Sequence, residues 1–179
     1  MKRIHNLDSR LNELFDEAER DYKFQPELTK KLDNHYGDFT ETTLLEIVLW
    51  KTNRYPTFTP ELIDDINDLR RHCTVHGAKI LLKKLLSLKG FDLPMASTVL
   101  RFACPDQFQI IDQRVYRFIS EDVDVFKKPH SDDKKVEVYF EYLDNLKDVC
   151  NKYNIPFRKA DRILYQLDKT FNSEYPIKY

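Results

Sequence analysis

Glycine, long apolar runs and cysteine are all scarce in this sequence. The 179 residues include only 3 glycines, against 12 phenylalanines and 10 tyrosines. So few glycines disfavour a turn-rich β fold and favour packed helices, and the aromatic content excludes intrinsic disorder. No apolar run approaches the roughly 20 residues that a membrane span needs. The first residues, MKRIHNLDSRLNELFDEAERD, also lack the apolar core of a secretory signal. We therefore expect a helical protein without a membrane partner.

The three cysteines, Cys73, Cys104 and Cys150, are odd in number and far apart in the sequence. This spacing predicts neither a disulfide framework nor a metal or iron–sulfur site. His72 and His76 stand at i and i+4, but no third metal ligand accompanies them. We expect a cytoplasmic protein with reduced cysteines, no metal and no other cofactor.

The net charge of −1 conceals an uneven distribution. Residues 1–68 contain 9 Lys/Arg and 15 Asp/Glu, whereas residues 69–103 contain 7 Lys/Arg and a single acid, Asp92. A basic segment between acidic or neutral flanks can bind a polyanion locally. The alternative is an ordinary solvated helix face, and charge alone does not separate the two interpretations.

Apolar residues recur at helical spacing almost throughout, which predicts an all-α fold. The predicted helices cover about 7–18, 28–36, 41–52, 60–69, 77–88, 93–103, 112–120, 136–150 and 157–171. Residues 41–52 are apolar on nearly every side, which predicts a central buried helix. Residues 127–135 have no apolar side chain, which predicts an exposed loop.

Residues 77–103 have the pattern of two helices joined by a short turn. Gly90 lies in the turn, where a Cβ would obstruct a tight backbone. Asp92 is a predicted cap for the second helix, and Pro94 falls in its first turn, where no helical hydrogen bond is lost. After this pair of helices, Asp112 begins the next predicted helix.

This arrangement resembles the helix-hairpin-helix DNA glycosylase superfamily, whose signature L-x-x-L-x-G-h-G-x-x-x-A is followed by an aspartate. Leu85, Leu88, Gly90 and Ala96 match the hairpin and Asp112 matches the aspartate. Residues 158–169 resemble the C-terminal helix of short bacterial relatives, and the whole match covers roughly residues 40–170. The resemblance implies one helical domain of two lobes over residues 1–179, with the helix-hairpin-helix at 77–103.

The resemblance also implies base-excision repair. Family members bind and kink duplex DNA and flip a damaged base into a cleft. Asp112 would stabilise positive charge on the deoxyribose and orient or activate the nucleophile. The alternative role for Asp112 is helix capping alone, and one residue can combine both roles.

Two positions depart from the family signature. The lysine with which the bifunctional branch attacks the sugar is replaced by Pro94, so the resemblance implies monofunctional hydrolysis without strand cleavage. The second hairpin glycine is Asp92, whose carboxylate stands where a phosphate would approach. These departures leave two alternatives open: a non-catalytic helix-hairpin-helix DNA-binding module, and a helical protein-interaction domain.

The candidate DNA-contacting residues are the cations and the turn of the hairpin region, together with the polar end of helix 41–52, which would form a minor-groove wedge. They are Lys83, Lys84, Lys89, Gly90, Phe91, Met95, Arg101, Lys51, Thr52, Asn53 and Arg54. The resemblance also implies a site for a monovalent cation on the main chain of Leu86, Leu88 and Phe91. Arg114 and Arg117 are expected either to contact phosphate or to pair with acidic residues.

Overall fold

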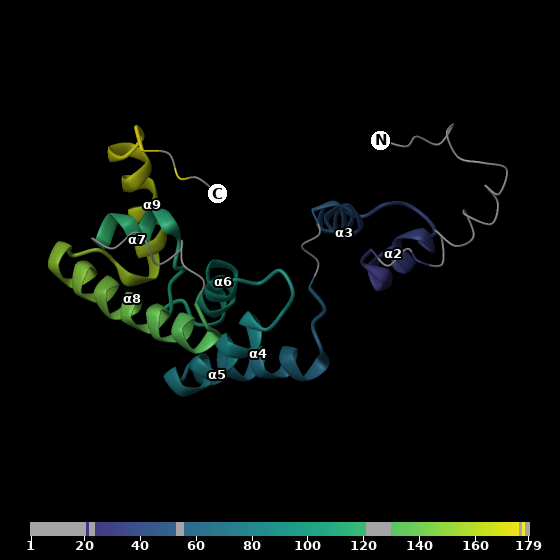
Figure 1. Cartoon of the computed structure of the whole chain (residues 1–179), viewed down its shortest axis with the longest axis horizontal. Helices are drawn as coiled ribbons and strands as arrows, with labels where there is room; N and C mark the ends of the chain where they lie inside the picture. The colour runs from purple at the N-terminus through teal and green to yellow at the C-terminus, as the bar shows by residue number, and fades with distance from the viewer. Residues whose placement is uncertain (1–20, 22–23, 53–55, 121–129, 176, 178–179) are drawn as a thin grey trace. The chain divides into compact units, whose positions relative to one another are not determined.

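The computed structural model describes residues 21, 24–52, 56–120, 130–175 and 177 (Figure 1). The chain divides into two compact units, Met1–Tyr55 and Pro56–Tyr179. All regular structure in the described ranges is helical, which confirms the all-α prediction. None of the helices described there has the length and apolar character needed to cross a bilayer. The helix predicted at 7–18 lies outside the described residues.

The described part of the first unit is a pair of helices, α2 (Pro26–Asp33) and α3 (Glu41–Lys51). The side chain of Thr40 caps α3 by accepting a hydrogen bond from its first turn. Trp50 Nε1 donates to Thr29 Oγ1 at 2.8 Å, which joins the end of α3 to the middle of α2. Trp50 therefore packs within this unit.

Within the first unit, the prediction that residues 41–52 form a buried helix is met only in part. The helix forms, but Leu44, Leu45 and Val48 are 52%, 56% and 57% exposed. Thr43 is the buried residue of α3. A helix that is apolar all round has no amphipathic face to indicate which side packs, so its sequence predicts the helix better than it predicts the burial.

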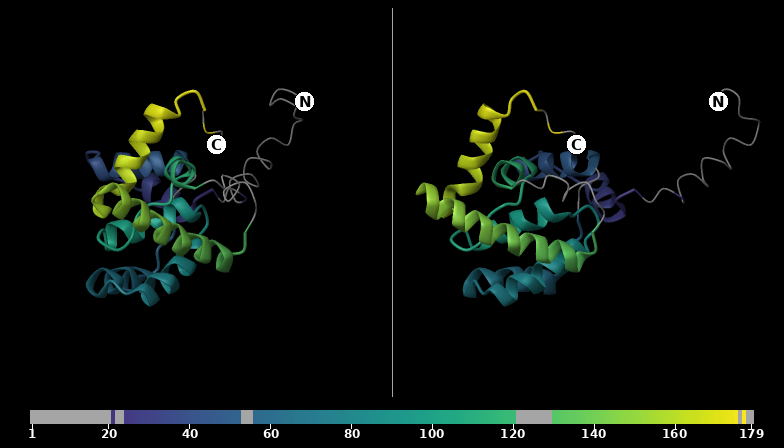
Figure 2. Two further views of the ribbon diagram at one scale, coloured as in Figure 1. Left: turned by 90° about the vertical axis from the view of Figure 1, so that its left-hand side faces the viewer. Right: turned by 60° about the vertical axis from the view of Figure 1, so that its left-hand side comes forward.

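The second unit contains the remaining helices. They are α4 (Pro60–His72), α5 (Val75–Leu86), α6 (Leu93–Ala103), α7 (Gln113–Ile119), α8 (Asp132–Tyr153), a 3-10 turn (Phe157–Lys159) and α9 (Ala160–Phe171). Helices α4, α5 and α6 pack on one another, and the long α8 runs from α5 and α6 to α7, which packs on α9 (Figures 1 and 2). Leu82, Leu85, Leu100 and Leu146 are fully buried in its core.

Capping residues begin most helices of this unit. Thr59, Thr74, Asp92, Asp112 and Ser131 each accept a hydrogen bond from the first turn of α4, α5, α6, α7 and α8, respectively. The predicted starts of α4, α6 and α7 follow from these local signals. A short polar side chain before the helix accepts hydrogen bonds from N–H groups that have no partner within the helix.

Of the predicted loop at 127–135, residues 127–129 lie outside the described residues, and the prediction is wrong from Asp132 onward. Helix α8 begins at Asp132, with Ser131 as its cap. The first turn is charged because it is largely exposed, and acidic residues at this end interact favourably with the helix dipole. The lack of apolar side chains in this segment is therefore due to an exposed helical turn and not to a loop.

A disulfide joins Cys73 and Cys104, whose Cα atoms lie 5.8 Å apart. The expectation of reduced cysteines is wrong for this pair. Cys73 ends α4 and Cys104 ends α6, and the two ends meet because α4, α5 and α6 pack together. Cys150 is free and buried. Since structural disulfides are rare in reducing compartments, the cysteines no longer support the prediction of a cytoplasmic location.

Candidate functional site

The predicted pair of helices and its turn form as α5, residues 87–92 and α6. Gly90 has a φ of +84°, a conformation that side chains with a Cβ rarely adopt. The Leu88 carbonyl accepts the N–H of Phe91 at 3.1 Å, which closes the turn. Asp92 Oδ1 accepts the N–H of Leu93 at 2.7 Å and caps α6, as predicted. We refer to α5, the turn and α6 together as the hairpin.

Asp92 has a cationic partner that sequence reasoning missed. Lys135 Nζ, from the first turn of α8, lies 2.9 Å from Asp92 Oδ1. Burial opposes ionisation of Asp92, but the hydrogen bonds from Lys135 and from the Leu93 N–H hold the pKa of Asp92 below its usual value. Lys135 thus offsets the negative charge that Asp92 brings to the hairpin. No local signal could have found this contact, because it joins two separate helices.

Lys83 and Lys84 lie on the exposed side of α5, and each pairs with an acidic residue. Lys83 Nζ lies 2.7 Å from Asp133 Oδ1, and Lys84 Nζ lies 2.5 Å from Asp65 Oδ2. The hydrogen bond from Lys83 to Asp133 raises the pKa of the lysine. Exposed ion pairs of this kind contribute little to stability, so both lysines can exchange their partners for an anionic ligand.

Four more of the predicted DNA-contacting residues lie in the turn or at the start of α6. Lys89 and Gly90 are exposed. Phe91 packs edge-to-face on Phe58, with ring centroids 6.0 Å apart, and Met95 is 42% exposed. The hairpin therefore presents a cation, a glycine and apolar side chains on the same short segment.

Arg101 is not on the basic surface, contrary to the prediction. It is 7% exposed, and its Nε lies 3.4 Å from Oδ2 of the buried Asp161. Its Nη2 donates to the Arg158 carbonyl at 3.3 Å. Arg101 therefore joins α6 to the start of α9 in the interior and is unable to contact a phosphate backbone. Nothing in the sequence of α6 indicates that Arg101 pairs with Asp161.

The residues predicted to form a minor-groove wedge belong to the first unit or lie outside the described residues. Lys51 is the last residue of α3, and Thr52 follows it as the C-cap. Thr52 Oγ1 donates to the Val48 carbonyl at 3.0 Å. Asn53 and Arg54 lie outside the described residues. The wedge stays a prediction.

The predicted cation site involves the carbonyls of Leu86, Leu88 and Phe91. The Leu88 carbonyl is engaged by the Phe91 N–H. A carbonyl oxygen has a second lone pair, so this hydrogen bond is compatible with a monovalent cation. The cation site also stays a prediction.

Asp112 is the N-cap of α7. Its Oδ1 accepts the main-chain N–H of Arg114 at 2.7 Å, and the residue is half-buried. Asp112 therefore does cap a helix. Capping uses one carboxylate oxygen, and the second oxygen can still accept a hydrogen bond or face a developing positive charge.

The segment that leads to Asp112 is tied to the hairpin and to α8. The Ile111 N–H donates to Ser97 Oγ, on α6, at 3.2 Å. Tyr139 Oη donates to the Gln109 carbonyl at 3.0 Å, and Tyr142 Oη donates to the Ile110 carbonyl at 2.8 Å.

Both tyrosines lie on α8 and are buried, and burial raises the pKa of each hydroxyl far above its usual value. Tyr139 and Tyr142 therefore remain protonated donors. Because the chain is held from both sides just before Asp112, the position of Asp112 relative to the hairpin is defined.

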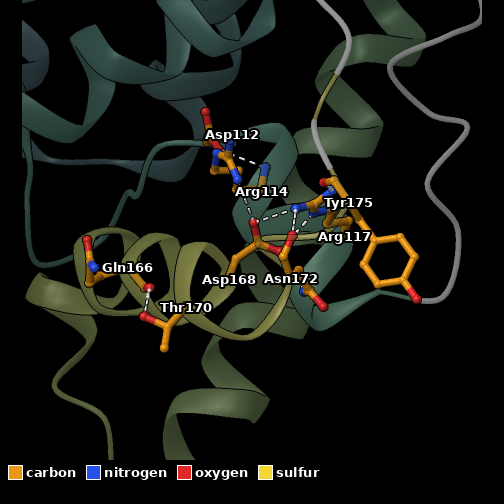
Figure 3. A network of polar contacts seen from close by, with 8 residues as sticks. All are labelled: Asp112, Arg114, Arg117, Gln166, Asp168, Thr170, Asn172 and Tyr175. Atoms are coloured by element: carbon orange, nitrogen blue, oxygen red, sulfur yellow. Dashed lines mark hydrogen bonds and ion pairs between the residues drawn. The ribbon is translucent and has the colours of Figure 1, made fainter.

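A fully buried carboxylate on α9 holds α7 (Figure 3). Asp168 is 0% exposed. Arg117 donates to both of its oxygens, from Nε at 2.8 Å and from Nη2 at 2.9 Å, and Arg114 Nη1 donates at 3.2 Å. Of the two roles expected for Arg114 and Arg117, pairing with an acidic residue is the one observed. The sequence of α9 offered no signal for Asp168 beyond an acidic residue on an amphipathic helix.

The stability of the protein should depend on the ionisation of Asp168. Burial opposes ionisation, but hydrogen bonds from Arg117, Asn172 and Arg114 hold the pKa of Asp168 below its ordinary value of 3.8. A depressed pKa stabilises the fold above the pKa of the unfolded chain, and this contribution is lost as the pH falls through the lower native value.

We therefore expect the difference in unfolding free energy between wild type and Asp168→Asn to be constant above about pH 5 and to shrink below pH 3.8. Urea unfolding over this pH range measures it. Asp106→Asn, which removes an exposed pair with Arg158, is the control and should show a small difference at every pH. A constant difference for Asp168→Asn would show that the network does not depress this pKa.

An apolar pocket of 720 Å³ lies at the other end of α7. Phe118, Ile119, Val149, Ile163 and Leu167 are among its lining residues, and Asp112 is not. Since α7 has seven residues, this pocket is about 10 Å along the helix from Asp112. It is therefore not a pocket for a base that reacts at Asp112.

Comparison of the chain with protein-family models, with curated proteins and with solved structures finds no match. Function is therefore inferred from the hairpin, from Asp112 and from the contacts of α7.

Proposed function

We propose that this protein binds duplex DNA through the hairpin and hydrolyses the N-glycosidic bond of a flipped, damaged base, with Asp112 as the catalytic carboxylate. The observation that carries the proposal is the attachment of the segment before Asp112 to α6. The hydrogen bond from the Ile111 N–H to Ser97 Oγ, at 3.2 Å, joins the residue before the candidate carboxylate to the second helix of the hairpin. A DNA strand held at the hairpin would thus have a carboxylate at a defined position beside it.

The proposed reaction needs one fixed negative group. As the C–N bond to the base breaks, its electron pair leaves with the base and positive charge develops on the deoxyribose. A carboxylate near the sugar stabilises that charge and accepts a proton from the water whose oxygen bonds to C1′. Asp112 Oδ1 is engaged by the Arg114 N–H, so Oδ2 is the oxygen assigned to this role.

The hairpin lacks a nucleophilic amine at the position of the bifunctional enzymes. Pro94 occupies it, in the first turn of α6. Proline has no primary amine to form a Schiff base with the sugar. The expected products are therefore a free base and an intact strand with an abasic site.

Base release and DNA binding together test the proposal. Duplexes with one deaminated, oxidised or alkylated base are incubated with the protein, and abasic sites are revealed by alkaline cleavage. Release from at least one lesion, with no strand break before alkali, supports the enzyme. Binding that weakens steeply with salt but yields no release supports a non-catalytic DNA-binding module. The absence of both activities supports a protein-interaction domain and contradicts the proposal.

The acidic partners of Lys83 and Lys84 should weaken DNA binding. We expect Asp65→Asn with Asp133→Asn to bind duplex DNA more tightly than wild type, because both lysines are then available to phosphates. The plot of log affinity against log salt should steepen by up to about 2. Fluorescence anisotropy at several salt concentrations measures both quantities.

Asp144→Asn is the matched control for this double variant. Asp144 is an exposed acid that pairs with Lys147, in the middle of α8. Its replacement changes the net charge but leaves Lys83 and Lys84 paired. The affinity of Asp144→Asn is compared with that of a single replacement at Asp65 or Asp133. If the gains in affinity are equal, the effect comes from net charge, and Lys83 and Lys84 do not contact the DNA.

A further inference from the structure

The short helix α7, whose N-cap is Asp112, is held on α9 by the carboxylate of Asp168 (Figure 3). We propose that Asp168 is a positioning residue. Through Arg114 and Arg117 it sets the orientation of α7, and thereby the orientation of the Asp112 carboxylate at the start of that helix. This inference rests on the proposed function for its catalytic consequence, but its structural part can be tested without catalysis.

The first step concerns the length of α7. It has seven residues, and helices much shorter than about 12 residues are marginal in water without tertiary contacts. Its intrinsic stability is therefore too low to define the direction in which its N-cap points. The contacts of α7 with α8 and α9 have to do so.

The second step concerns the geometry of the contact. Arg117 presents Nε to Asp168 Oδ1 and Nη2 to Asp168 Oδ2, at 2.8 and 2.9 Å. Two parallel hydrogen bonds between a planar guanidinium and a carboxylate define rotation as well as distance. A bidentate pair therefore restricts how α7 can turn on α9.

The third step connects this pair to Asp112. Arg114 donates from Nη1 to Asp168 Oδ2 at 3.2 Å, while its main-chain N–H donates to Asp112 Oδ1 at 2.7 Å. One residue thus touches the buried carboxylate through its side chain and the candidate catalytic carboxylate through its backbone. A displacement of Arg114 displaces the cap.

Asp168 acts through these contacts and does not touch a substrate itself. Its side chain is fully buried, and Asn172 Nδ2 adds a further hydrogen bond at 2.8 Å. With four donors on its two oxygens, the carboxylate has no room for a reacting group.

Helix α9 offers a matched control. Asp161 is also buried, also lies on α9 and also pairs with an arginine, but its partner is Arg101 on α6. Asp161→Asn therefore removes a comparable buried charge without touching α7. Both variants should unfold at a lower temperature than wild type, because each removes a buried carboxylate that pairs with an arginine.

Two measurements on the full-length protein distinguish the variants. The first is the hydrogen-exchange rate of the Arg114 amide, followed by NMR. Asp168→Asn should accelerate it, whereas Asp161→Asn should leave it unchanged. The second is the single-turnover rate of base release at saturating enzyme. Asp168→Asn should lower this rate about 100-fold, because a displacement of a catalytic group by about 1 Å has an effect of that size. The affinity for DNA should be unchanged.

A double variant tests whether Asp168 acts through Asp112. Asp112→Asn with Asp168→Asn should be no slower than Asp112→Asn alone, because the residue to be positioned has lost its charge. Arg117→Lys, which keeps the positive charge but loses the bidentate geometry, replaces Asp168→Asn if that variant does not fold. We expect Arg117→Lys to show the same faster exchange and slower release.

The inference is overturned if Asp168→Asn leaves the hydrogen-exchange rate of the Arg114 amide unchanged. It is also overturned if Asp168→Asn and Asp161→Asn change the exchange rate and the rate of base release equally. If the wild-type protein releases no base, the proposed function fails, and the amide-exchange comparison still decides whether Asp168 orders the cap. The two failures are therefore distinguishable.

Discussion

Asp112→Asn is expected to lower the rate of base release by about 100-fold to 10,000-fold, the usual contribution of a positioned acid–base group. Asparagine is as good an N-cap as aspartate, so the hydrogen bond to the Arg114 N–H can persist and α7 can remain folded. The variant loses the negative charge and little else. Alkaline cleavage of a damaged duplex under single-turnover conditions measures the effect.

The two roles of Asp112 separate when a second replacement is added. Asp112→Ala removes both the charge and the cap, so it should lose as much activity as Asp112→Asn and also about 1 kcal/mol of stability. Thermal unfolding of both variants shows the difference. If Asp112→Asn releases the base at the wild-type rate, Asp112 acts only as a helix cap and the proposed mechanism is ruled out.

Loss of the bridge between Cys73 and Cys104 is expected to lower the unfolding free energy by about 2–4 kcal/mol. The bridge spans a sequence separation of 31, a stretch that contains all of the hairpin, and it restricts the unfolded chain. For a chain of this size the melting temperature should fall by roughly 4–16 °C. Thermal unfolding with and without a thiol reductant measures the shift.

Two variants identify the cysteines responsible. Cys73→Ser with Cys104→Ser should melt at the lower temperature and should not respond to the reductant. Cys150→Ala removes the free, buried cysteine and should keep the response. Titration of the denatured, unreduced wild-type protein should detect one thiol. Three thiols, together with a melting temperature that the reductant leaves unchanged, would contradict the disulfide.

The hairpin was predictable from the sequence because its signals are local. Gly90 was predicted from the need for a tight turn and has a φ of +84°. Asp92 and Asp112 were predicted as caps, and each accepts an N–H from the helix that follows it. Each of these contacts joins neighbours in the chain, so residue type and order suffice to predict them.

The surroundings of the site were not predictable, because their contacts join residues distant in sequence. Arg101 was expected on a basic surface and is instead buried beside Asp161. Lys83 was expected to be available to DNA and pairs with Asp133. Asp168, which anchors α7, was not predicted as a site residue, because acidic residues are common on amphipathic helices.

The sequence alone determined that the described chain is helical and where α4, α6 and α7 begin, since capping, proline placement and apolar periodicity act within a few residues. Only the tertiary structure decided which charges are buried and which cysteines meet. Those outcomes depend on the packing of whole helices, as when α4 and α6 bring Cys73 to Cys104. An arginine or a cysteine has the same local preferences whether its partner is water or a side chain from another helix, so its partner follows from the packing.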